Sequence, residues 1–202
     1  MRSASVAFKS VVLLLSIGAL WGADKEKPFK PGPIESYPCR FTQEKVTIAA
    51  EPFDKEEETK TAFGKLNPNR YGILPVLVLI RNDSEETISL EDLRVEYITE
   101  ARQRIEATPA RDVAKTNSPA RPRVTPGPWP GPVPRGTRNN PLNAWEIEGR
   151  AFVARMLPPG ETASGFFYFQ APHRAGASLY ITGIKEARSR RALFYFEIPL
   201  DK

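Results

Sequence analysis

An unbroken apolar run, residues 76–80, ends at the polar sequence Arg81-Asn82-Asp83-Ser84. A strand with one face in water alternates apolar and polar residues, whereas a continuous run indicates that both faces are covered. A buried helix produces the same run. This one, however, has only about five residues, follows Pro75 and is rich in β-branched side chains, which favours a strand. The pattern therefore predicts a strand in the middle of a sheet.

Shorter apolar or alternating segments predict the other strands. They lie at residues 44–50, 93–98, 145–157, 166–169, 179–181 and 193–198, with a short apolar piece at 87–90. The segment 90–105 also fits a helix, because its apolar residues recur at helical spacing. We favour a hairpin in which 93–98 pairs with 102–107.

One short helix is predicted at about residues 54–64. Asp54 can accept from an amide of the first turn while Glu57 reaches back, as in a capping box. Gly64 would end the helix in a left-handed conformation. The acidic run 56–58 suggests a cation site, but consecutive helical side chains point in different directions, which favours a solvated helix face.

Residues 117–143 form the largest break in the pattern. The segment is rich in proline and glycine and contains almost nothing that extends a helix or a strand ladder. Because proline lacks an amide donor and fixes one backbone dihedral, we predict a long extended or disordered loop. Such a loop is either a tolerated insertion or a functional segment. For the second case the candidate partner-binding residues are Trp129, Arg121, Arg123, Arg135 and Arg138.

The first residues have the layout of a secretory signal. Arg2 and Lys9 precede an apolar core over residues 11–20, which is shorter than the roughly 20 residues that span a bilayer. We predict a signal peptide at 1–23, an extended leader at 24–43 and a single domain at 44–202. The alternative is an uncleaved N-terminal membrane anchor. The only cysteine, Cys39, cannot form an internal disulfide, so a buried core has to stabilise the fold.

Composition excludes several chemistries. Removing Arg2 and Lys9 from the 29 basic residues leaves 27 against 24 acidic residues, an excess too small to indicate a nucleic-acid partner. The only histidine, His173, lies in a predicted turn and is interpreted as a solvated loop residue. One histidine and one cysteine are too few for a four-ligand zinc site, and no nucleotide-binding motif is present. We therefore expect no metal and no cofactor.

Two further features leave alternatives open. Acidic side chains from distant positions could meet as a catalytic pair; the candidates are Glu146, Glu148 and Glu161. Consecutive aromatic residues at 166–169 and 194–196 place rings on both faces of two strands. Inward rings belong to the core, and outward rings could form a platform for a sugar or a partner chain. Asn82-Asp83-Ser84 also matches a glycosylation acceptor.

A strand ending in Arg81-Asn82-Asp83, a pair of short strands, and Leu157-Pro158-Pro159-Gly160-Glu161 before an aromatic strand resemble secreted immunoglobulin-like β-sandwiches. The resemblance covers about residues 72–98 and 145–200. It implies a mainly β, antiparallel sandwich outside the cytoplasm. The chain lacks the cysteine pair of antibody domains and adds a helix and a proline-rich loop.

These observations favour a non-catalytic binding module, secreted or periplasmic, whose partner is an unknown protein or an acidic polymer. The indole ring of Trp129 and the guanidinium groups of the four arginines near it would suit either partner. The first alternative is a structural component of the cell envelope that self-assembles through an aromatic face. The second is a small hydrolase that uses carboxylates.

Overall fold

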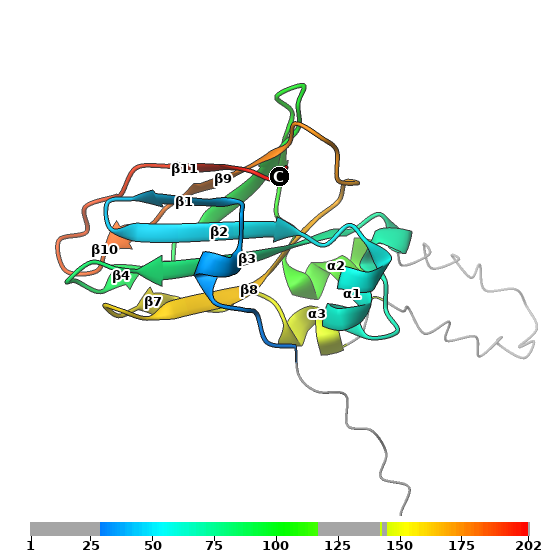
Figure 1. Cartoon of the computed structure of the whole chain (residues 1–202), viewed down its shortest axis with the longest axis horizontal. Coiled ribbons are helices and arrows are strands. Elements are labelled where there is room, and N and C mark those ends of the chain that lie inside the picture. Colours follow the sequence, from blue (N-terminus) through cyan, green and yellow to red (C-terminus); the bar gives the residue numbers. More distant parts are fainter. Residues whose placement is uncertain (1–28, 117–141, 143–144, 202) are drawn as a thin grey trace, which may run out of the picture.

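The computed structural model of the protein describes residues 29–116, 142 and 145–201. In this part of the chain the strands form three antiparallel sheets (Figure 1). The first has the order β1-β2-β3-β8, the second β11-β9-β5-β6 and the third, much shorter, β10-β4-β7. Their bounds are β1 Arg40–Gln43, β2 Val46–Pro52, β3 Leu74–Asn82, β4 Ile88–Ser89, β5 Arg94–Ile98, β6 Arg104–Glu106, β7 Met156–Leu157, β8 Thr162–Phe169, β9 Ser178–Thr182, β10 Lys185–Glu186 and β11 Phe196–Pro199. The prediction of a mainly β fold is confirmed.

The apolar run at residues 76–80 lies inside β3, which pairs with β2 on one side and β8 on the other. Val76, Val78 and Ile80 point into the space between the two large sheets. Leu77 and Leu79 point to the opposite face, where helices and the N-terminal segment cover them. Both faces of β3 are therefore buried, as the continuous run predicts.

Three α-helices gather at one end of the first sheet (Figure 1). They are α1 Glu56–Phe63, α2 Ala110–Thr116 and α3 Trp145–Gly149, with short 3-10 turns η1 Ile34–Ser36 and η2 Pro68–Tyr71. Phe63, Val113 and Ile147 bring the three helices onto Phe166 and Tyr168 of β8. The molecule therefore has three layers over part of its length: helices, the first sheet and the second sheet.

The predicted short helix is confirmed, but its start is not the expected one. The helix begins at Glu56, and Lys55 occupies the N-cap position without a side-chain capping bond. The prediction of a capping box that starts at Asp54 is therefore wrong. Gly64 ends the helix with a backbone φ of 62°, a conformation that residues with a Cβ atom rarely adopt. The hairpin is also confirmed, because Tyr97 of β5 is paired with Ile105 of β6.

Two predicted boundaries are wrong. Residues 40–43, assigned to an extended leader, form β1 and pair with β2, so the folded domain begins before residue 44. Ile34 and Tyr37 are also buried against the first sheet. Residues 145–149, predicted as the start of a strand, form α3. The strand pattern places Trp145 on the same side as Ile147, but Trp145 is 67% exposed and only Ile147 turns inward.

The proline-rich loop, including Trp129, lies outside the described residues, apart from Leu142, which is buried. The predicted signal peptide also lies outside the described residues. The specifically immunoglobulin-like topology stays a prediction. Within the described segments no helix has both the length and the apolar composition needed to cross a membrane.

Candidate functional site

The second sheet turns one face to the core and the other to solvent. Val95, Leu179 and Ile181 point inward. Alternation of side chains along a strand then places their neighbours on the outer face. The pairing of β11, β9, β5 and β6 brings four of these outward residues into one row; they are Glu197, Tyr180, Glu96 and Glu106.

Tyr180 lies at the centre of a stack on this outer face. The Tyr195 ring packs against the Tyr180 ring with centroids 5.2 Å apart and planes inclined by 29°. The Arg104 guanidinium also lies over the Tyr180 ring, 5.0 Å from its centroid. Arg104 also donates to Glu96 at 3.0 Å, which orients the guanidinium. We call Arg104, Tyr180 and Tyr195 the Arg–Tyr stack.

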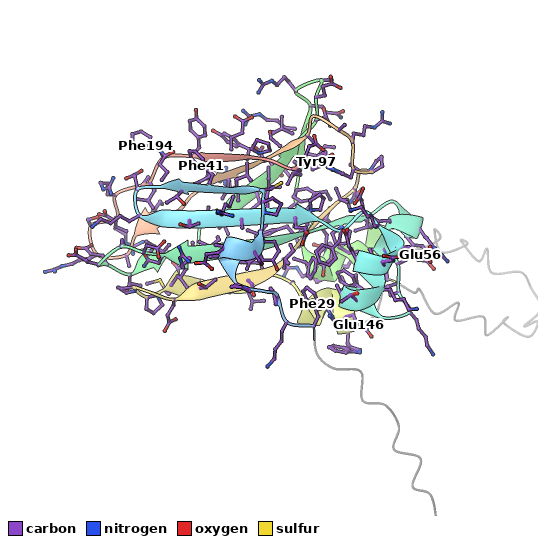
Figure 2. All side chains as sticks on the ribbon, viewed as in Figure 1. Phe29, Phe41, Glu56, Tyr97, Glu146 and Phe194 are labelled. Carbon is purple, nitrogen blue, oxygen red and sulfur yellow. The ribbon has the colours of Figure 1, made fainter. Side chains whose placement is uncertain are left out.

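One end of the stack opens into a concavity of about 450 Å³, which we call the aromatic corner. Its walls are Phe41, Phe194 and Tyr195, and its polar groups are Gln43 and Glu197. The three rings are 42%, 67% and 53% exposed, respectively. Figure 2 shows Phe41 and Phe194 together at the end of the sandwich away from the helices. Exposed rings gathered in this way are typical of binding surfaces.

The other end of the stack borders a groove of about 690 Å³ between β6 and β8, which Arg104 and Tyr180 also line. Phe152 and Phe167 stack in its wall, with ring centroids 5.3 Å apart. Phe152 reaches this place because β8 carries a glycine where the two segments cross: a Cβ on Gly165 would collide with the Phe152 backbone. The Arg–Tyr stack therefore joins the groove and the aromatic corner, and we call the three together the outer aromatic surface.

Phe194 is positioned by the carboxylate of Glu44, whose side chain is 20% exposed. Its backbone N–H donates to Glu44 at 2.8 Å, and Arg191 donates to the same carboxylate at 2.6 Å. These two contacts, the N–H of Phe194 first and then Arg191, hold the pKa of Glu44 below its usual range. Arg191 also pairs with Glu186, so one guanidinium links β10 to the turn between β1 and β2.

The lowered pKa of Glu44 leads to a pH-dependent prediction. A carboxylate whose pKa is lower in the folded state contributes stability above its unfolded pKa of about 4.3, and this contribution is lost as the pH falls through the folded value. We expect the NMR amide signal of Phe194 to stay constant at neutral pH and to shift only at pH values below the usual pKa range of a glutamate. Glu44→Gln should show the altered signal already at pH 7, with little further change on acidification. An identical titration in both proteins would contradict the assignment.

His173 is not the solvated residue that its turn sequence suggests. Its side chain is 12% exposed, Nδ1 lies 3.3 Å from the Tyr97 hydroxyl and Nε2 lies 3.5 Å from Asp201. The hydroxyl accepts from the N–H of Arg174, and the Cys39 thiol donates to the Asp201 carbonyl. With partners at both ring nitrogens, His173 ties the C-terminal segment to the second sheet.

The predicted carboxylate candidates do not come together. Tyr168, near the end of β8, donates to the carbonyl of Ile147 and so places α3 beside it. Glu161 precedes the first residue of β8, at the opposite end of that strand from Glu146 and Glu148. In the described ranges no three His, Cys, Asp or Glu side chains are arranged to hold a metal ion.

The sequence prediction placed the binding residues elsewhere. Trp129 and the four arginines at 121, 123, 135 and 138 lie outside the described residues. The sequence shows aromatic residues at 194–196 but does not show which of them are exposed. Arg104 and Tyr180 were not candidates, because they are distant in sequence and only the strand pairing brings them together.

Comparison with known proteins leaves the function open. No protein-family model matches the chain, and no curated protein matches it. A solved structure of a functionally unknown protein from Listeria monocytogenes EGD-e is similar at 11% identity, covering 80% of this chain and 81% of that one, with a TM-score of 0.30. A similarity this low carries no conclusion. The class of protein is therefore defined by the fold and the surface: a mainly β sandwich with an exposed aromatic site.

Proposed function

We propose that this protein is a non-catalytic binding module, exported from the cytoplasm, that holds a polysaccharide chain on its outer aromatic surface. The observation that carries the proposal is the Arg–Tyr stack, because it joins two concavities across the face of one sheet. Neighbouring strands are about 4.8 Å apart, so a surface crossing the four strands extends over roughly 14 Å. An extended polymer can contact such a surface along its length. The proposal of export rests on the N-terminal sequence.

The composition of the aromatic corner suits a sugar ring. A sugar has faces of C–H groups, which pack on the apolar faces of rings such as Phe194 and Tyr195. Its hydroxyls both donate and accept hydrogen bonds, and they find a carboxylate at Glu197 and an amide at Gln43. A concavity of about 450 Å³ lies within the range of small-molecule sites.

The charges around the surface favour a neutral ligand. Arg104 is paired with Glu96, and Glu197 lies within 3.6 Å of Arg102. Charges of both signs are therefore interspersed and largely compensated. A strongly charged ligand would have no complementary field to steer it to this face.

Removing the exposed rings should abolish polysaccharide binding. We expect the wild-type protein to be retained by at least one insoluble neutral polysaccharide among cellulose, chitin and xylan. Replacing Phe194 and Tyr195 together by alanine should weaken the binding at least about tenfold, since burying each ring stabilises a complex by about 1.5–3 kcal/mol. Depletion of the protein from solution over a series of polysaccharide concentrations measures the affinity.

The matched control is Trp145→Ala, which removes a ring that is equally exposed but lies on α3, outside the surface. Its affinity should equal that of the wild type. Failure of the wild-type protein to bind any of the three polysaccharides would refute the proposal. Light scattering tests the alternative of self-assembly: an oligomer that dissociates in the Phe194→Ala/Tyr195→Ala variant would assign the surface to assembly and overturn the proposal.

A further inference from the structure

A third concavity, which we call the basic cleft, lies at the opposite end of the molecule from the aromatic corner. It is formed by α1, the segment after it, η2 and Arg150, and has a volume of about 550 Å³. Four cationic side chains line it, with one carboxylate; they are Lys60, Lys65, Arg70, Arg150 and Glu56. In Figure 2, Glu56 marks the helical end, far from the labels of Phe41 and Phe194. The cleft and the outer aromatic surface share no residue.

Arg150 is the most firmly positioned of the four cations. Its guanidinium lies 5.8 Å from the ring centroids of Phe29, Phe63 and Trp145. Its backbone carbonyl accepts from the N–H of Phe166 at 2.8 Å, which anchors the residue to β8. Contacts with several rings hold a guanidinium in place while its charge is kept. The cleft therefore has a preorganised cation in its wall.

The dipole of α1 explains only part of this cluster. Cations are favoured near the C-terminal end of a helix, which accounts for Lys60 in the last turn. Arg150 comes from a segment far along the chain, after α3, and Arg70 comes from η2. Three separate parts of the fold thus bring positive charge to the same concavity.

The charge balance of the cleft indicates the kind of ligand. Glu56 compensates Arg70, to which it is paired at 2.6 Å, so four cations and one carboxylate leave a formal excess of three positive charges. A phosphate monoester carries about −1.5 to −2 charges at pH 7, so two phosphate groups match this excess. Arginine and lysine are the side chains that bind phosphate oxygens through charge-assisted hydrogen bonds. We propose that the basic cleft binds a ligand that carries two phosphate groups close together.

Inorganic pyrophosphate is the probe that tests this site, with the full chain titrated in an isothermal calorimeter at low salt. We expect one pyrophosphate to bind per chain, and orthophosphate to bind at least about tenfold more weakly because it loses a set of charge-assisted contacts. Citrate, a carboxylate of similar charge, should bind no better than orthophosphate. Equal binding of citrate and pyrophosphate would overturn the assignment to phosphate.

Variants locate the site. Lys60→Gln/Lys65→Gln should weaken pyrophosphate binding at least about tenfold. Glu56→Gln should strengthen it by about two- to fivefold, since it removes a negative charge and releases Arg70. The control Arg174→Gln/Arg188→Gln removes the same charge from exposed positions that do not line the cleft. A loss in the control equal to that in the lysine variant, or no pyrophosphate binding by the wild type, would overturn the proposal. Neither result concerns polysaccharide binding, so the two proposals fail independently.

Discussion

Replacing Phe166 by alanine is expected to lower the free energy of unfolding by about 3–5 kcal/mol, the range for removing a buried phenylalanine. Phe166 is 2% exposed and lies between the first sheet and the helices. Its ring contacts those of Phe63, Phe53 and Phe29, at centroid distances of 4.9, 5.0 and 5.6 Å. The substitution would therefore leave a cavity where the N-terminal segment, the end of β2 and α1 meet β8.

Chemical denaturation followed by tryptophan fluorescence measures this loss. The matched control is Phe167→Ala on the same strand. Phe167 turns to the other face, is only partly buried and stacks on Phe152 in the groove. We expect the control to cost less than about 2 kcal/mol, because part of the side chain is already in contact with water. Equal losses in the two variants would show that the ring cluster around Phe166 does not anchor the helical layer.

The second large effect is expected for Asn82→Asp. Asn82 is fully buried, and its Nδ2 donates to the carbonyls of Glu86 at 2.7 Å and Leu157 at 3.0 Å. Its Oδ1 accepts from both the backbone N–H and the hydroxyl of Ser84. An ionised aspartate has no donor, so the substitution removes both hydrogen bonds and places a charge beside the two carbonyls, although that of Glu86 also accepts from the Ser84 hydroxyl. Each lost hydrogen bond at a buried site costs about 1–3 kcal/mol, so with the added charge we expect a loss of about 3–5 kcal/mol.

The control for this prediction is the reverse exchange at the next position, Asp83→Asn. Asp83 is exposed and forms an ion pair with Arg81. Losing an exposed pair costs about 1 kcal/mol or less. Thermal unfolding of both variants at neutral pH measures the difference. Equal decreases in the two unfolding midpoints would contradict the proposed role of Asn82.

The burial of Asn82 also means that the glycosylation motif is inaccessible in the folded protein.

The sequence carries a signal for the aromatic residues at 194–196 but none for the contact between Arg104 and Tyr180. The consecutive rings at 194–196 predict a strand at 193–198 with rings on both faces, but β11 begins only at Phe196, so Phe194 and Tyr195 precede it. Phe196 became core, whereas Phe194 and Tyr195 stayed exposed. Arg104 and Tyr180 lie 76 positions apart, and their contact depends on β5 pairing with β6 on one side and β9 on the other.

The two boundary errors have a common cause. Strand β1 has no buried residue in its four positions, so it carries no apolar signal, and only its pairing with β2 makes it a strand. In residues 145–149 apolar side chains alternate, yet only Ile147 is buried, because α3 packs on α2 and β8 through that side chain. A segment of five residues is too short to separate a helical from an extended pattern.

The sequence by itself determined that the fold is mainly β, that β3 is covered on both faces and that a short helix ends at Gly64, because each depends on local apolar patterning or on the conformational freedom of one residue. The tertiary structure decided which rings stay in water, where positive charges gather and which polar strand closes the sheet edge. These outcomes depend on contacts between residues far apart in the chain, and no periodicity within a segment records them. The outer aromatic surface and the basic cleft, on which both proposals rest, belong to this second group.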